Sequence, residues 1–112
     1  MSLRILILLL LPLNALAETW VCAFKCYVGD EICQTQFARN GKHFVDEYGS
    51  KFVHEESREF LTIVRYSASD EYKEAFVFSH IINKKTGDYK KQQLTNEKRF
   101  IEPRSGKCEI VK

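Results

Sequence analysis

The sequence is poor in the residues from which catalytic sites are usually built. Its 112 residues include three histidines, one tryptophan, one methionine and two prolines. His43, His54 and His80 are scattered along the chain, and no serine lies in a Gly-x-Ser-x-Gly sequence, so no nucleophile pairs with a base. Adjacent carboxylates such as Asp46-Glu47 would point to opposite faces of a strand. The sequence therefore predicts a protein that is not an enzyme.

Metal and phosphate motifs are absent as well. The spacing Cys22-x3-Cys26-x6-Cys33 lacks the paired Cys-x2-Cys of structural zinc sites. After His54, the second histidine of a zincin helix would fall at Arg58. The chain also has no glycine-rich phosphate loop. We expect no metal and no cofactor.

The sequence has no apolar run long enough to cross a membrane as a helix, which needs about 20 residues. Its longest run, Ile5–Leu11, follows a basic start, and Ala15 and Ala17 occupy the small-x-small positions before a cleavage site. This pattern predicts a cleavable signal peptide over residues 1–17 and one domain over residues 18–112. We expect a secreted or periplasmic protein with no transmembrane segment after cleavage.

Four cysteines, an even number, lie in the exported part. In an oxidising compartment such cysteines form disulfides. Two bridges, at about 2–4 kcal/mol each, would support a core that is small in a domain of this length. Three pairings are possible. The expected strand positions favour Cys26–Cys33 and Cys22–Cys108.

The exported part has no segment of helical period and length, and hydrophobic alternation dominates it. Trp20, Cys22 and Phe24 share the face of the first strand that we expect in the core. Many short strands joined by turns predict an all-β fold, a small antiparallel meander barrel or sandwich of about seven to eight short strands, braced by disulfides. The alternative is a small α+β domain with one short helix near Val53–Glu59.

Turn residues set the expected strand register. A two-residue turn at Gly29-Asp30 would bring the second and third cysteines opposite each other. Asn40-Gly41 is a strong hairpin signal that would place Phe37 opposite Phe44. Ser105-Gly106 is expected to form a turn before the last strand.

Positive charge gathers near the end of the chain, where Lys84–Lys112 contains nine basic and four acidic residues. A tyrosine flanked by lysines would suit an acidic protein partner or anionic lipid headgroups. An ordinary solvated hairpin explains the same residues. Nucleic acid is not an expected partner, because the net charge of the whole chain is only +2. The candidate partner-binding residues are Lys84, Lys85, Tyr89, Lys90 and Lys91.

The leading functional hypothesis is a non-catalytic binding domain for a protein partner in the envelope or outside the cell. The alternative is a binder of a small apolar ligand in a barrel cavity. A hydrolase with an unrecognised site ranks third. The aromatic residues that could line such a cavity are Trp20, Phe24, Phe37, Phe44, Phe60, Phe76 and Phe78.

Overall fold

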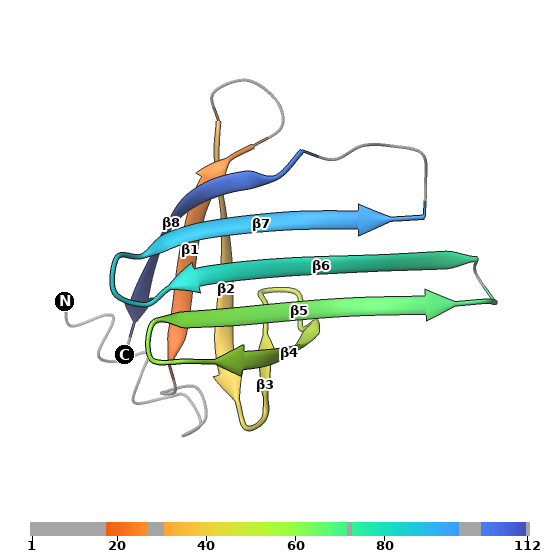
Figure 1. Ribbon diagram of the computed structural model, residues 1–112, viewed down its shortest axis with the longest axis horizontal. Helices are drawn as coiled ribbons and strands as arrows, with labels where there is room; N and C mark the ends of the chain where they lie inside the picture. Colours follow the sequence, from red (N-terminus) through yellow and green to blue (C-terminus); the bar gives the residue numbers. More distant parts are fainter. Residues whose placement is uncertain (1–17, 27–30, 72, 97–101, 112) are drawn as a thin grey trace.

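The computed structural model describes residues 18–26, 31–71, 73–96 and 102–111, and these form an eight-stranded closed antiparallel barrel. Each strand pairs with the next, and the last pairs with the first (Figure 1). The strands are β1 Thr19–Lys25, β2 Ile32–Asn40, β3 His43–Val45, β4 Lys51–Glu56, β5 Phe60–Ser69, β6 Glu74–Asn83, β7 Asp88–Thr95 and β8 Arg104–Val111. The predicted all-β meander barrel is confirmed.

The α+β alternative is wrong. No helix forms among the described residues, and β4 runs through the segment where the short helix was placed. β4 continues to Glu56, and the turn into β5 closes with the backbone nitrogen of Ser57 donating to the carbonyl oxygen of Phe60 at 2.9 Å. The polar sequence from Glu55 to Arg58 therefore belongs to a strand end and a tight turn.

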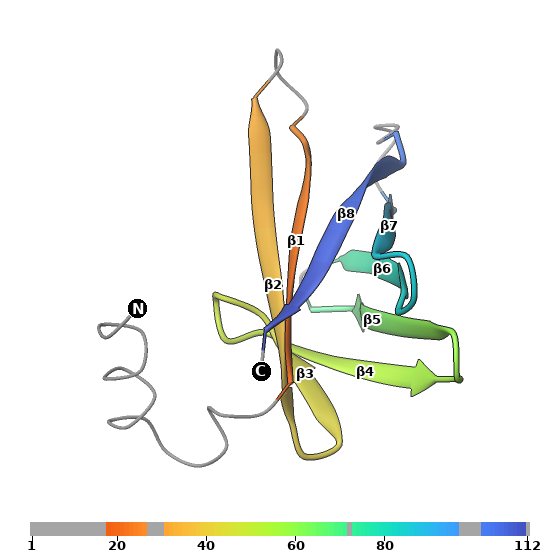
Figure 2. The ribbon, with the colours of Figure 1, turned by 90° about the vertical axis from the view of Figure 1, so that its left-hand side faces the viewer.

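The core fills the barrel interior because alternate residues of each strand point inward. Figures 1 and 2 show β1, β2 and β8 crossing β5, β6 and β7 at a steep angle, so the two groups of strands face each other across this core. The predicted inward face of β1 is confirmed. The buried apolar side chains are Trp20, Cys22, Phe24, Phe37, Phe44, Phe52, Leu61, Ile63, Ile82, Tyr89 and Cys108.

Two disulfides brace the strands in the pairing that the sequence favours. Cys22 on β1 and Cys108 on β8 are directly opposite in register, with Cα atoms 4.0 Å apart and a sequence separation of 86. This bridge lies on the seam where the first and last strands of the barrel pair. Cys26 and Cys33 join the two sides of the β1–β2 hairpin, with Cα atoms 5.4 Å apart.

The β1–β2 hairpin is registered two residues away from the predicted alignment. Phe24, and not Cys26, lies opposite Cys33. The backbone nitrogen of Cys26 donates to the carbonyl oxygen of Glu31 at 3.0 Å, so four residues lie between this bonded pair, where the prediction placed two between the last paired residues. The predicted Gly29-Asp30 turn lies outside the described residues. A slip of two leaves every side chain on its predicted face, and for this reason the core is still as expected.

The β2–β3 hairpin shows the same difference. Asn40 pairs with His43, which leaves Gly41 and Lys42 as the loop, and Gly41 has a φ of 62°. Phe44 consequently lies opposite Arg39, and not opposite Phe37 as predicted. The positive φ belongs to the glycine, so Asn40 is free to stay in the strand.

The expected turn at Ser105-Gly106 is wrong, because both residues lie inside β8. Gly106 lies opposite Phe24 on β1 and opposite Tyr89 on β7. A Cβ at Gly106 would collide with the carbonyl oxygen of Ala23 and lie 3.0 Å from the Cα of Phe24. A glycine in a strand interior often marks such a close backbone approach, and here it lets β8 and β1 close the barrel.

Replacing Gly106 by alanine is therefore expected to lower the free energy of unfolding by about 3 kcal/mol or more, at the upper end of overpacking effects, because the obstacle is backbone. Urea denaturation followed by circular dichroism measures the loss. Gly41→Ala is the control: an added Cβ meets nothing within 4 Å there, so only the left-handed backbone opposes it, at roughly 1 kcal/mol. Equal losses in the two variants would contradict the close approach of β8 to β1.

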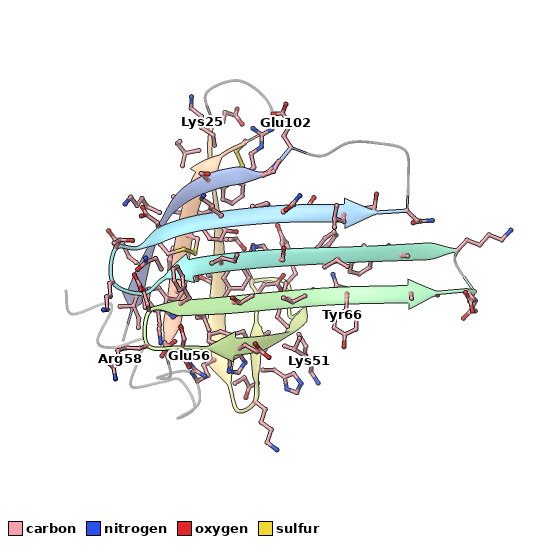
Figure 3. The ribbon with its side chains drawn as sticks, viewed as in Figure 1. Lys25, Lys51, Glu56, Arg58, Tyr66 and Glu102 are labelled. Atoms are coloured by element: carbon pink, nitrogen blue, oxygen red, sulfur yellow. A yellow bond between two sulfur atoms is a disulfide. The ribbon has the colours of Figure 1, made fainter. Side chains whose placement is uncertain are left out.

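One end of the barrel is closed by an ion-pair network. Arg39 bonds to Glu18 at 3.2 Å and to Glu56 at 3.0 Å, and Lys84 reaches Glu56 at 2.9 Å. The indole nitrogen of Trp20 donates to Glu18 at 2.7 Å. Figure 3 shows Glu56 beside the β4–β5 turn, with Tyr66 further along β5 towards the opposite end. We call the opposite end the mouth.

Candidate functional site

The mouth holds an open cavity of about 480 Å³. Its walls come from strands β1, β2, β4, β5, β6 and β7 and from the loop between β3 and β4. Four phenylalanines form its apolar surface: Phe24, Phe37, Phe52 and Phe78. Volumes of about 300–1,000 Å³, a mostly apolar lining and a few placed polar groups are typical of small-molecule sites. The volume of this cavity lies in that range, and its lining combines the phenylalanine surface with many polar and charged side chains.

The aromatic residues named from the sequence divide into three groups. Phe24, Phe37 and Phe78 line the cavity. Trp20 and Phe44 are buried in the closed core. Phe60 is 44% exposed, and Phe76 stacks on Phe78 with ring centroids 4.5 Å apart. The barrel interior near the closed end is therefore filled by side chains, while the interior near the mouth is left open.

His80 lines the cavity and is hydrogen-bonded to Tyr89, which is buried in the core. His80 Nδ1 and the Tyr89 hydroxyl are hydrogen-bonded at 2.7 Å, and their rings stack with an interplanar angle of 4°. Phe37 and Phe52 pack against the His80 ring at centroid distances of 4.7 and 5.7 Å. Burial, and secondarily the charge of Lys91, lowers the pKa of His80 to about 3. His80 is therefore neutral at physiological pH.

Lys91 lies on the cavity wall, opposite His80 on β6 and Arg104 on β8. Its ammonium nitrogen is 4.2 Å from the centroid of the Phe24 ring, a cation–π contact. Burial lowers the pKa of Lys91, the nearby Arg104 lowers it further, and Glu47 acts in the opposite direction. The positive charge of Lys91 is thus only partly offset by the negative charge of Glu47.

Arg65 and Gln93 complete the inward row nearest the mouth. Arg65 pairs with Phe78, which in turn pairs with Gln93. The Arg65 guanidinium carbon is 5.1 Å from the centroid of the Phe76 ring. A planar guanidinium that stacks on an aromatic ring still presents its N–H groups at its edge, where a carboxylate or similar anion can bind.

The β3–β4 loop fixes an acidic residue on the rim of the mouth. The Glu47 carboxylate accepts hydrogen bonds from the backbone nitrogen of Gln36 at 2.9 Å and from the Thr35 hydroxyl at 3.2 Å. Asp46 accepts bonds from the backbone nitrogens of Tyr48 and Ser50, at 3.0 and 2.8 Å. Both carboxylates are therefore engaged by the protein itself.

The structure divides the five residues of the predicted basic hairpin. Tyr89 is 1% exposed and points into the barrel, and Lys91 lies on the cavity wall. Lys84 is held by Glu56 at the closed end. Lys85 and Lys90 are exposed to solvent. These five residues therefore do not make up one surface with Tyr89 at its centre.

A second hollow, of about 550 Å³, lies on the outer face of β4 and β5, lined by residues that include Val53, Val64 and Tyr66. Tyr66 is 64% exposed, and its register partner Val77 is 40% exposed. Outer residues of a barrel often include scattered apolar side chains. This hollow lacks the buried polar pair found in the mouth, so the mouth is the better candidate site.

Within the described ranges, no group of three or more histidine, cysteine, aspartate or glutamate side chains is arranged to hold a metal ion. All four cysteines are in disulfides. The described residues also contain no helix of the length and apolarity needed to span a membrane.

The chain matches no family model, and no curated protein or solved structure is significantly similar to it. The geometry of the mouth is therefore the basis for assigning a function.

Proposed function

We propose that this protein binds a small molecule with a flat apolar part in the mouth of the barrel and releases it unchanged. The observation that carries the proposal is the cavity of about 480 Å³. Its aromatic side chains line the barrel interior there and do not fill it. Its rigid walls favour binding, because closed β-barrels of this strand number can hold one small ligand.

The absence of catalysis is part of the proposal. A general base works best when its pKa lies near the working pH. His80, the histidine on the cavity wall, has a pKa of about 3 and takes up protons poorly at neutral pH. The cysteines supply no thiolate nucleophile, since all four are bonded. These features suit a binding site better than a hydrolytic one.

We also propose that the protein works outside the cytoplasm, exported by residues 1–17. The two disulfides are consistent with an oxidising compartment, extracellular or periplasmic. The alternative of a protein partner bound through the basic hairpin has less support, because the hairpin's residues point in different directions and Tyr89 is buried.

A neutral fluorescent dye tests the binding function. N-phenylnaphthylamine, which brightens in apolar surroundings, is expected to bind the oxidised protein saturably with one dye per chain. Gln93→Trp should fill the mouth and weaken binding by about tenfold or more, which corresponds to roughly 1.4 kcal/mol. Fluorescence titration gives both the affinity and the stoichiometry.

Gln92→Trp is the matched control, because Gln92 is the neighbouring residue on β7 and faces the solvent. It should leave dye binding unchanged. No saturable binding, or equal effects of the two tryptophan variants, would refute the proposed function. The melting temperature of each variant is measured to verify that both fold.

A further inference from the structure

The inward cations of the mouth lie in two adjacent rows of paired residues. One row runs from His80 on β6 through Lys91 on β7 to Arg104 on β8. The next row towards the mouth runs from Arg65 on β5 through Phe78 to Gln93. Inward neighbours on paired strands lie within reach of long side chains, and of these basic groups Arg65, His80 and Lys91 line the cavity.

Lys91 and Arg65 lack an acidic partner within the described part of the chain. No described carboxylate lies within 4.0 Å of either, and their contacts there are the rings of Phe24 and Phe76. An aromatic ring attracts a cation without neutralising its charge. The positive charge in the mouth is therefore available to a ligand.

The acidic residue closest to this charge does not cancel it. Glu47 acts on Lys91, but its carboxylate is already bonded to Thr35 and to the backbone of Gln36. The lowered pKa of Lys91 has burial as its largest cause and Arg104 as the next. A bound anion would stabilise the charged lysine and reverse part of this effect.

We propose that the ligand is an aromatic or other flat apolar organic anion, whose carboxylate or sulfonate binds Lys91 and Arg65 while its ring lies on the phenylalanine surface. This inference rests on the proposed function and adds the charge and the contact residues. The guanidinium of Arg65 supplies a fork of N–H donors, and Lys91 supplies a point charge deeper on the wall. Gln93, in the same row as Arg65, adds an amide that can bond to a second oxygen.

Two dyes with the same ring skeleton separate this inference from the proposed function. Anilinonaphthalene sulfonate carries a sulfonate that N-phenylnaphthylamine lacks. At low salt we expect the sulfonate dye to bind the oxidised protein about tenfold more tightly, the lower end of what one charged hydrogen bond contributes. The advantage should shrink as salt rises, since screening weakens partly exposed charge pairs.

Lys91→Gln and Arg65→Gln should each weaken the sulfonate dye about tenfold and lower the ratio of the sulfonate-dye affinity to the neutral-dye affinity, because glutamine removes the charge from the cavity wall. Lys90→Gln is the matched control, because Lys90 precedes Lys91 on β7 and points to the solvent. It removes the same charge from the protein without touching the cavity, so it should leave both affinities unchanged.

The outcomes are distinct. If the neutral dye binds the mouth and the two glutamine variants leave the sulfonate dye unaffected, the anion inference is wrong and the proposed function stands. If Lys90→Gln weakens the sulfonate dye as much as Lys91→Gln does, the attraction is a general surface effect and the inference is also wrong. If neither dye binds saturably, the proposed function fails together with the inference.

Discussion

Replacing Cys22 and Cys108 together by alanine is expected to lower the free energy of unfolding by about 4 to 5 kcal/mol. The bridge closes a loop with a sequence separation of 86 residues, and the entropy that such a crosslink removes from the unfolded chain grows with loop length. The total stability of a small domain is about 5–15 kcal/mol. The double variant should therefore lose a large share of its stability and melt at a much lower temperature than the natural protein, as circular dichroism melting will show.

The second disulfide is the natural control for this prediction. Cys26 and Cys33 have a sequence separation of only seven, so their replacement by alanine should lower the free energy of unfolding by roughly 2.5 kcal/mol. The difference between the two double variants, measured by urea denaturation, is the quantity that matters. Equal losses would show that the disulfide between β1 and β8 stabilises the fold no more than the disulfide within the β1–β2 hairpin does.

Hydrophobic alternation was sufficient to predict the inward face of the first strand. Trp20, Cys22 and Phe24 share an inward face because side chains alternate along a strand, and this holds whatever the strand pairs with. The pairing of Cys22 with Cys108 followed from placing one on the first strand and the other on the last strand of a closed meander. These predictions depend on local pattern and on connection rules alone.

Register could not be predicted in the same way. A slip of two residues keeps every side chain on its face, so the hydrophobic pattern is identical for Phe37 opposite Phe44 and for Arg39 opposite Phe44. Only the loop conformation decides between them. The φ of 62° at Gly41 and the length of the β1–β2 connection are properties of the folded hairpins, and several turn types fit the same residues.

Gly106 shows a second limit of sequence reasoning. Ser-Gly is a common turn sequence, and nothing local distinguishes it from a glycine that a strand needs. The reason for this glycine is the Ala23 backbone, which lies more than 80 residues earlier in the chain. A contact of that kind becomes visible only when β1 and β8 are brought together.

The candidate site was partly accessible from the sequence. Tyr89, Lys91 and Gln93 alternate along β7 and so share the inward face, whereas Lys90 lies between them and points outward. The prediction of a basic docking surface grouped residues by their closeness in the sequence, and it missed this alternation. Arg65 could not have been added, because its place in the mouth depends on the pairing of β5 with β6.

The buried His80 should make the barrel sensitive to acid. Its pKa is about 3 in the folded protein and 6.5 in the reference state of an exposed histidine. Between pH 3 and pH 6.5 the unfolded chain binds a proton at His80 that the folded barrel does not bind, so the free energy of unfolding falls as the pH drops through this window. Above pH 6.5 this loss is absent. Each pH unit in the window removes up to about 1.4 kcal/mol, and the total loss at pH 3 is on the order of 4 kcal/mol.

His80→Gln isolates this contribution, since glutamine keeps a group that can bond to the Tyr89 hydroxyl and has no proton to gain. Glu56 and Asp88, whose pKa values are lowered chiefly by hydrogen bonds from Lys84 and Lys107, add acid sensitivity to both proteins alike. In urea denaturation from pH 7.5 down to pH 3.5, the unfolding free energy of the natural protein should fall towards that of the variant, closing part of the gap between them. A gap that stays constant with pH would mean that His80 is protonated inside the barrel or is not buried there.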